Sequence, residues 1–452
     1  MKSINPFNNK LIKEYKEHSV SDVDSIIKDV HKELKTWKNT SFDERSKLMK
    51  NAGEILRSES EKFAELMTSE MGKVILQAKA EIEKCAALCD YYAENAQQIL
   101  CDEFIQTDAS KSFVSFEPIG SIFAIMPWNF PFWQVFRFAV PNLIAGNTAI
   151  LKHAPNVCGC SLAIEEIFQK AGFPKNVFRS LIIPVELAEQ VITNDLVAGI
   201  TLTGSAKAGS IVASQAGKYL KKSVLELGGS DPFIVLKDAD LSKACQTGTD
   251  SRLLNAGQVC ISAKRFIVEE EIADEFIEFQ KHLFENYKIG DPMKTETKMG
   301  PMARLDLLEN IIDQVQKSIE MGASLICGGK IIESDGFFYQ PTILTNVKKG
   351  MPVYDEETFG PVSVIIRVKN TEEAIKVAND TIYGLGASIW TSDLSRGEAV
   401  ARKIEAGAVF VNGMTKSDAR LPFGGIKKSG FGRELASYGI KEFLNIKTIW
   451  IG

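Results

Sequence analysis

The sequence predicts an α/β protein made of two Rossmann-like α/β domains and a small β element that extends from them. The chain has 452 residues, which is more than one hydrophobic core usually supports. Short apolar runs alternate with helical patterns in both halves, as in parallel βαβ units. A predicted hairpin and an apolar C-terminal run lie outside this alternation.

The composition is that of an ordinary soluble protein. Hydrophobic residues make up 45%, charged residues 25%, and the net charge is -5, so we expect neither nucleic acid nor a membrane surface as a partner. No apolar signal segment follows Lys2, and no apolar run is long enough to span a membrane, so we expect a cytoplasmic protein. The eight cysteines and four histidines are dispersed, which predicts reduced thiols and no metal site.

The first hundred residues are predicted to be a helical layer with little chemistry. Helical spacing runs from Ser21, a plausible cap, to Trp37, and Ser41 opens a capping box for a second helix. A third helical region covers 73–100.

Strand and helix patterns alternate through the rest of the chain. We expect a hairpin at 104–116 and a C-terminal strand at 443–451 that pairs with it. Further strands are expected at 120–126, 148–152, 199–203, 224–227 and 233–236 and near residues 265, 325 and 362. One helix is expected over the segment that contains Arg137, a second in the segment that ends at Ala171, and a third from about Ala206 onward. Further helices are expected at 244–254, 272–283, 305–321 and 371–379.

Cys260 lies in a glycine-containing bend, 255–262, between a helical pattern and a strand pattern. A cysteine at such a junction can present its sulfur to a cleft. A buried packing role is nevertheless the commoner one for a cysteine, so the bend alone leaves both roles open.

Three other stretches have residue types that could bind a cofactor or take part in catalysis. Gly204 to Gly209 joins a strand to a helix, where free backbone N–H groups can bind a phosphate, although a plain turn fits equally well. Glu226 sits in an apolar strand beside two glycines, so it either points to solvent or serves as a general base. Asn129 is either a turn former or an amide donor for an oxyanion.

Five segments together resemble the aldehyde dehydrogenases, in family order and spacing, over nearly the whole chain. The segments are Pro127-Trp128-Asn129-Phe130-Pro131, Leu225-Glu226-Leu227-Gly228-Gly229, Gly257-Gln258-Val259-Cys260, Glu357-Thr358-Phe359-Gly360-Pro361 and Pro422-Phe423-Gly424-Gly425-Ile426-Lys427-Lys428-Ser429-Gly430.

The resemblance implies an NAD(P)-dependent oxidation of an aldehyde to an acid. Cys260 would form a thiohemiacetal and then a thioester, Asn129 would stabilise the oxyanion, and Glu226 would activate the hydrolytic water. A non-catalytic nucleotide-binding or structural relative would be expected to have lost these residues. A member that transfers the acyl group to coenzyme A would be expected to lack Glu226.

The resemblance also implies the cofactor site. Its residues would be Trp128, Lys152, Gly204, Ser205, Gly209, Glu357 and Phe359. Many NAD-preferring relatives have a glutamate three residues after the lysine, where this chain has Pro155, so the cofactor is expected to be NAD or NADP.

Within the family, the chain is most similar to short bacterial succinate-semialdehyde dehydrogenases. Arg137 matches an arginine that holds the substrate carboxylate in those enzymes, although it could also be a helix-surface arginine. Leu254 occupies a position where another subgroup has a second arginine, and Arg252 and Ser417 are candidates to replace it. Another small or aliphatic aldehyde is the alternative substrate.

The domain boundaries follow from the same resemblance. Residues 1–102 and 119–229 would bind the cofactor, 230–422 would form the catalytic domain, and 423–440 would return to the cofactor domain. Residues 103–118 and 441–452 would form an oligomerisation element, so we expect a homodimer or a homotetramer.

Overall fold

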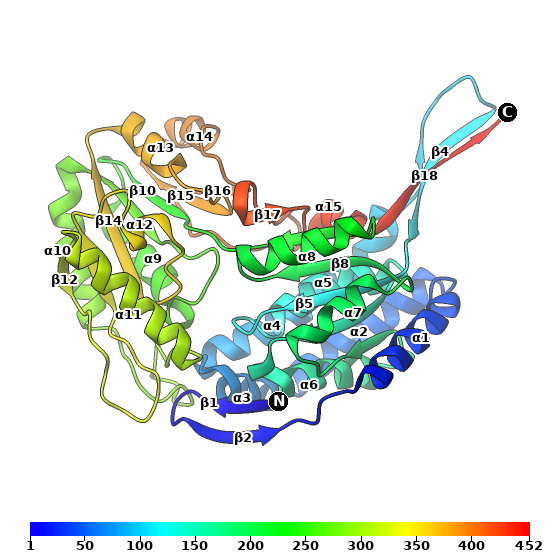
Figure 1. The fold of residues 1–452 in the computed structure, drawn as a ribbon. Coiled ribbons are helices and arrows are strands. Elements are labelled where there is room, and N and C mark those ends of the chain that lie inside the picture. The colour runs from blue at the N-terminus through cyan, green and yellow to red at the C-terminus, as the bar shows by residue number, and fades with distance from the viewer.

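The computed structural model describes all 452 residues, with two β-sheets flanked by helices and a β-ribbon that projects from one of them (Figure 1). This is the predicted α/β class. The predicted domain boundaries themselves stay predictions.

The first sheet has six strands in the order β17-β9-β8-β5-β6-β7, all parallel except β17. Its strands are β5 (Ser121–Met126), β6 (Thr148–His153), β7 (Phe178–Ser180), β8 (Val197–Thr203), β9 (Lys222–Glu226) and β17 (Gly430–Phe431). The connecting helices are α5 (Trp133–Ile144), α6 (Cys158–Lys170), α7 (Ala188–Thr193) and α8 (Ala206–Lys218). Because the strands are parallel, the carboxyl ends of β5, β8 and β9 lie at one edge, where ligands of such sheets bind.

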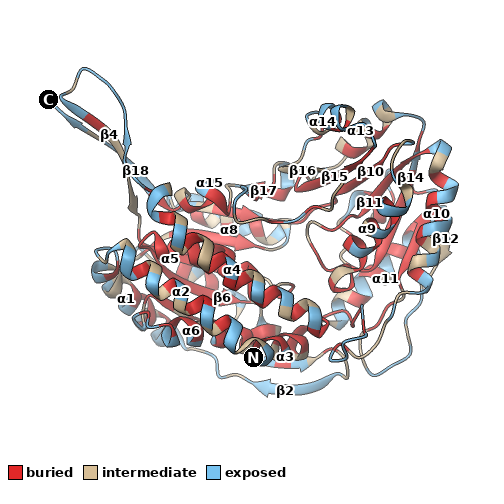
Figure 2. Cartoon of the chain, turned by 180° about the vertical axis from the view of Figure 1, so that it is seen from behind, coloured by how far each residue is buried: buried red, intermediate tan, exposed pale blue.

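The predicted helical layer covers this sheet. It consists of α1 (Val20–Trp37), α2 (Phe42–Ser58), α3 (Ser60–Met71) and α4 (Ile75–Ile99). The cap of α1 is Ser19 rather than the predicted Ser21, because Ser19 and Asp22 form a reciprocal capping box that starts two residues earlier. The buried faces of α2, α3, α4 and α5 form one large apolar core (Figure 2).

The second sheet has seven strands in the order β12-β13-β14-β11-β10-β15-β16, all parallel except the edge strand β12. Its strands are β10 (Pro232–Val235), β11 (Arg265–Glu269), β12 (Ser324–Cys327), β13 (Thr342–Thr345), β14 (Val362–Val368), β15 (Gly386–Trp390) and β16 (Ala408–Val411). Its helices are α9 (Leu241–Leu253), α10 (Glu270–Glu285), α11 (Leu305–Glu320), α12 (Pro352–Asp355), α13 (Thr371–Asn379) and α14 (Leu394–Ala401).

The predicted pairing of the hairpin with the C-terminal strand is confirmed. β4 (Lys111–Pro118) pairs with β3 (Glu103–Phe104) on one side and, antiparallel along its full length, with β18 (Leu444–Ile451) on the other. A short helix, α15 (Ala436–Lys441), precedes β18. The ribbon projects into solvent and is largely exposed (Figures 1 and 2).

The chain begins with a hairpin that the sequence analysis did not predict, made of β1 (Lys2–Asn5) and β2 (Lys10–Glu14). None of the helices combines the length and the apolar character that crossing a membrane requires.

Candidate active site

The loop that carries Cys260 has an unusual backbone. After α9, Asn255, Ala256 and Gly257 all have positive φ, of 52°, 54° and 75°. Such a conformation is costly for the two residues that have a side chain. Hydrogen bonds hold it: the amide Nδ2 of Asn255 donates to the carbonyl of Asn129 at 3.0 Å. Gly257 is required because a Cβ there would lie 2.1 Å from the carbonyl oxygen of Gly360.

Cys260 separates two hollows. On one side is a pocket of about 120 Å³, and on the other a cavity of about 410 Å³ that includes Glu226 and the strand end at Gly204. The ammonium of Lys264 donates to the backbone carbonyl of Cys260 at 2.6 Å. Burial raises the pKa of the Cys260 thiol to about 11, against the opposing charges of Arg137 and Lys264. The sulfur can thus contact a small molecule in the pocket and a larger one in the cavity.

Glu226 ends β9 and faces the same cavity as Cys260. It is 2% exposed, and neither carboxylate oxygen has a hydrogen-bond partner. Burial and then the charge of Glu434 raise its pKa well above the usual range. A carboxyl group whose pKa is raised in this way is a stronger base once ionised, which suits general-base catalysis.

Asn129 also lines the cavity beside Cys260. Its Nδ2 donates to the carbonyl of Gln258 at 3.1 Å, which ties its amide to the cysteine loop. The Nδ2 group has two N–H donors, so one stays available for an oxyanion. The structure therefore brings Cys260, Glu226 and Asn129 to one cavity.

An ion pair that the sequence analysis missed fixes the loop after Asn129. Glu81, on α4, accepts hydrogen bonds from the backbone N–H groups of Phe132 and Trp133, both at 2.9 Å. The ammonium of Lys73 pairs with the same buried carboxylate. A glutamate in a helical pattern gave no sequence signal for this role.

Five of the predicted cofactor residues line the cavity: Trp128, Gly204, Ser205, Glu357 and Phe359. The rings of Trp128 and Phe359 meet edge to face, with centroids 5.8 Å apart. Glu357 accepts a hydrogen bond from the backbone N–H of Gly229 at 3.1 Å. Burial raises the pKa of Glu357, and Lys264 opposes that shift.

The other two predicted cofactor residues do not line this cavity, and their roles stay predictions. Lys152 is buried in β6, where its ammonium forms no ion pair and burial lowers its pKa. Gly209 lies inside α8, and a Cβ there would come within 2.6 Å of the Leu227 side chain. The structure thus gives Gly209 a packing role between α8 and the end of β9.

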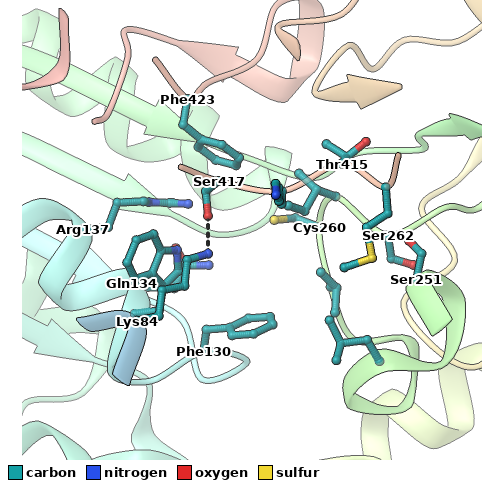
Figure 3. A pocket seen from close by; sticks show the side chains of 16 residues that line it. Lys84, Phe130, Gln134, Arg137, Ser251, Cys260, Ser262, Thr415, Ser417 and Phe423 are labelled. Atoms are coloured by element: carbon teal, nitrogen blue, oxygen red, sulfur yellow. Dashed lines mark hydrogen bonds between the residues drawn. The ribbon is translucent and has the colours of Figure 1, made fainter. Parts of the chain in front are cut away.

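The small pocket contains both predicted and unpredicted side chains (Figure 3). Arg137 lines it but is only 2% exposed, and its guanidinium is paired with the carboxylate of Glu434. Ser417 also lines it and accepts a hydrogen bond of 2.7 Å from the ammonium of Lys84. Other lining residues that the sequence analysis missed are Phe130, Trp133, Gln134, Thr415 and Phe423.

The prediction that Arg252 binds substrate is wrong for this structure. Arg252 is fully buried, and its guanidinium donates to the carbonyls of Gly257 and Ala263. It therefore braces both ends of the cysteine loop from inside the protein and does not reach the pocket.

Comparisons with known proteins agree with this geometry. The model of the aldehyde dehydrogenase family matches residues 1–449. The chain is 49% identical over 449 residues to a probable succinate-semialdehyde dehydrogenase [NADP(+)] of Synechocystis, covering 99% of each chain. It is 44% identical to the succinate semialdehyde dehydrogenase [NAD(P)+] Sad of Escherichia coli, covering 99% of this chain and 97% of that one. A solved succinic semialdehyde dehydrogenase from Streptococcus pyogenes, in complex with NADP+, superimposes with a TM-score of 0.98 at 39% identity, covering 100% of this chain and 99% of that one.

Proposed function

Since the chain belongs to the aldehyde dehydrogenase family, we propose that it oxidises succinate semialdehyde to succinate with NADP+, and with NAD+ as the alternative cofactor. The observation that supports this substrate is the small pocket at Cys260. Figure 3 shows Cys260 on one side and Arg137, Lys84 and Ser417 on the other. An aldehyde at the sulfur would place a carboxylate on a short chain near these cationic and hydroxyl groups.

In the proposed reaction, the thiolate of Cys260 adds to the aldehyde carbon and forms a thiohemiacetal. Its oxyanion accepts hydrogen bonds from the Asn129 amide and from the backbone N–H of Cys260. The nicotinamide cofactor, when bound, supplies the acceptor for the hydride that leaves this carbon. Glu226 then takes a proton from a water, the hydroxide adds to the thioester, and the acid leaves as the Cys260 thiolate re-forms.

The residues around the large cavity fit a dinucleotide. Gly204 and Ser205 precede α8, where Ser205 caps the helix and the other first-turn N–H groups can bind a phosphate. On β6, which is separated from β8 by β5 in the sheet, Lys152 has a buried ammonium without an ion-pair partner. Pro155 has neither a carboxylate to bind a 2′-hydroxyl nor one to repel a 2′-phosphate. These features support NADP+ as the first candidate and Trp128, Lys152, Gly204, Ser205, Glu357 and Phe359 as its contacts.

The function is tested with purified protein and a panel of aldehydes, each with NADP+ and with NAD+, by the absorbance of the reduced cofactor. We expect the highest kcat/KM with succinate semialdehyde and NADP+. Cys260→Ala should abolish turnover, whereas Cys101→Ala, at an exposed cysteine outside the site, should not. A clear preference for uncharged aliphatic aldehydes would contradict the proposed substrate.

The exposed ribbon supports the proposal of a homodimer or homotetramer. β18 carries the exposed apolar residues Ile446, Trp450 and Ile451, and Phe104 is exposed on β3. An apolar ribbon with free edges is stabilised when another subunit covers it. Light scattering on the purified protein measures the subunit number.

A further inference from the structure

Three cationic side chains line the small pocket, Lys84, Arg137 and Lys416, and they differ in burial and in how far their charge is already neutralised. The guanidinium of Arg137 is paired with the buried carboxylate of Glu434 and lies over the ring of Phe423, 4.5 Å from its centroid. The ammonium of Lys84 has no carboxylate within ion-pair distance, and its one hydrogen bond is to the neutral hydroxyl of Ser417. Lys416 also forms no ion pair, but it is exposed to solvent, so the half-buried Lys84 supplies the unpaired positive charge that is shielded within the pocket.

We propose that Lys84 binds the substrate carboxylate and sets the preference for a carboxylated aldehyde, with Arg137 as a secondary contact. This inference rests on the proposed function and identifies the residue that determines its specificity. It also revises the expectation from the family resemblance, which assigned the carboxylate to Arg137.

The surroundings of Lys84 suit this role. The ammonium lies 4.0 Å from the centroid of the Trp133 ring, and Phe130 and Phe423 form other walls of the pocket. An ammonium has three N–H donors, of which one is used on Ser417, so two remain for a carboxylate. Because the walls are apolar, the attraction between the ammonium and a carboxylate is stronger than in water.

Ser417 and Arg137 can add to this site. The Ser417 hydroxyl accepts a hydrogen bond from Lys84 and keeps its own proton for a carboxylate oxygen. The Nη2 group of Arg137 has no hydrogen-bond partner, so it can donate to the ligand while the guanidinium stays paired with Glu434. A carboxylate at Lys84 would thus receive donors from three side chains.

A substitution of Lys84 can change substrate specificity without also changing stability or the general base. Replacing Arg137 would leave Glu434 buried without its partner, close to Glu226, and would disturb both stability and the general base. Lys84 forms no ion pair, so its replacement leaves no carboxylate unpaired. The matched control is Lys79→Met, because Lys79 lies on the same helix but is partly exposed, lies outside the pocket and pairs with Glu61.

The experiment compares succinate semialdehyde with butanal, the uncharged aldehyde of the same chain length. In Lys84→Met we expect the KM for succinate semialdehyde to rise about 10- to 100-fold, the loss of one or two hydrogen bonds to a charged group. The kcat at saturation and the kcat/KM for butanal should stay within about twofold of wild type. Lys84→Arg should retain most of the preference, and Lys79→Met should keep all of it.

Direct binding gives a readout independent of turnover. Succinate should raise the thermal unfolding temperature of the wild-type protein and of Lys79→Met, but much less that of Lys84→Met. If Lys84→Met does not fold, Ser417→Ala tests the same site, with a smaller rise in the KM for succinate semialdehyde and none for butanal.

The outcomes separate this inference from the proposed function. A wild-type enzyme that does not prefer succinate semialdehyde over butanal overturns the proposed function. A wild-type enzyme that has the preference and keeps it in Lys84→Met overturns only the role of Lys84. An equal loss of kcat/KM for both aldehydes would show a structural role instead, and would also overturn it.

Discussion

The preference for a carboxylated aldehyde should fall as the pH rises from 7 to 9. Burial and then the charge of Arg137 lower the pKa of Lys84 from 10.5 to about 8, while Cys85, Glu81 and Asp418 oppose the shift. Because this pKa is lowered, the ammonium is charged at pH 7 and loses its proton within the window tested. The carboxylate of the substrate stays ionised throughout.

The size of the effect follows from the fraction of Lys84 that is protonated. With a pKa of about 8, this fraction is about nine tenths at pH 7 and about one tenth at pH 9. If only the charged form binds the carboxylate well, the kcat/KM for succinate semialdehyde should fall about tenfold relative to that for butanal. The ratio of the two substrates removes the titrations of Cys260 and Glu226, which affect both aldehydes alike.

The assay measures kcat/KM for both aldehydes at pH 7, 8 and 9, with wild-type protein and with Lys84→Arg. The arginine stays charged over this range, so its ratio should be independent of pH. A flat ratio in the wild type, or a parallel fall in Lys84→Arg, would refute the assignment of the titration to Lys84.

Three further predictions concern the site and the ribbon. In Glu226→Gln, one equivalent of reduced cofactor should form rapidly, followed by turnover about a hundredfold to ten-thousandfold slower than wild type. Mass spectrometry should detect the thioester on Cys260, and normal steady-state turnover would exclude Glu226 as the base. Arg137→Met should lower the free energy of unfolding by about 3–5 kcal/mol because Glu434 loses its buried partner. In denaturant unfolding, the double variant Arg137→Met/Glu434→Gln should recover most of this loss, whereas an equal loss in both variants would argue against a stabilising Arg137–Glu434 ion pair. Trp450→Glu, on the exposed face of the ribbon, should shift light scattering to a smaller oligomer, and an unchanged mass would show that the ribbon is not the contact.

The regular alternation of strands and helices made the two sheets predictable from the sequence. The short hairpin of β1 and β2 was missed because β2 is exposed along its whole length, so it has no alternation of buried and exposed residues. The cap of α1 was placed two residues late because Ser19 and Ser21 are both suitable residue types. Only the position of Asp22, three residues after Ser19, distinguishes them.

The site residues that lie in recognisable sequence motifs could be predicted from the sequence. Those that the helical layer contributes could not. Asn129 and Glu226 lie in motifs that resemble a known family, and the structure places both at the cavity of Cys260. Arg252 was misplaced because it was proposed to replace the arginine that another subgroup has at the position of Leu254, whereas its guanidinium turns inward to backbone carbonyls. Lys84 was missed because a lysine in a helix usually faces solvent.

A single helix, α4, positions the protein groups that would contact the two ends of the proposed substrate. Glu81 and Lys84 are three residues apart on α4, so they lie on one face of the helix. Glu81 fixes the backbone just after Asn129, at Phe132 and Trp133, while Lys84 faces the small pocket. The oxyanion donor and the proposed carboxylate contact are thus both positioned by α4, which fixes the distance between them. Since this distance is fixed by a rigid element, we expect the enzyme to discriminate among carboxylated aldehydes by chain length as well as by charge.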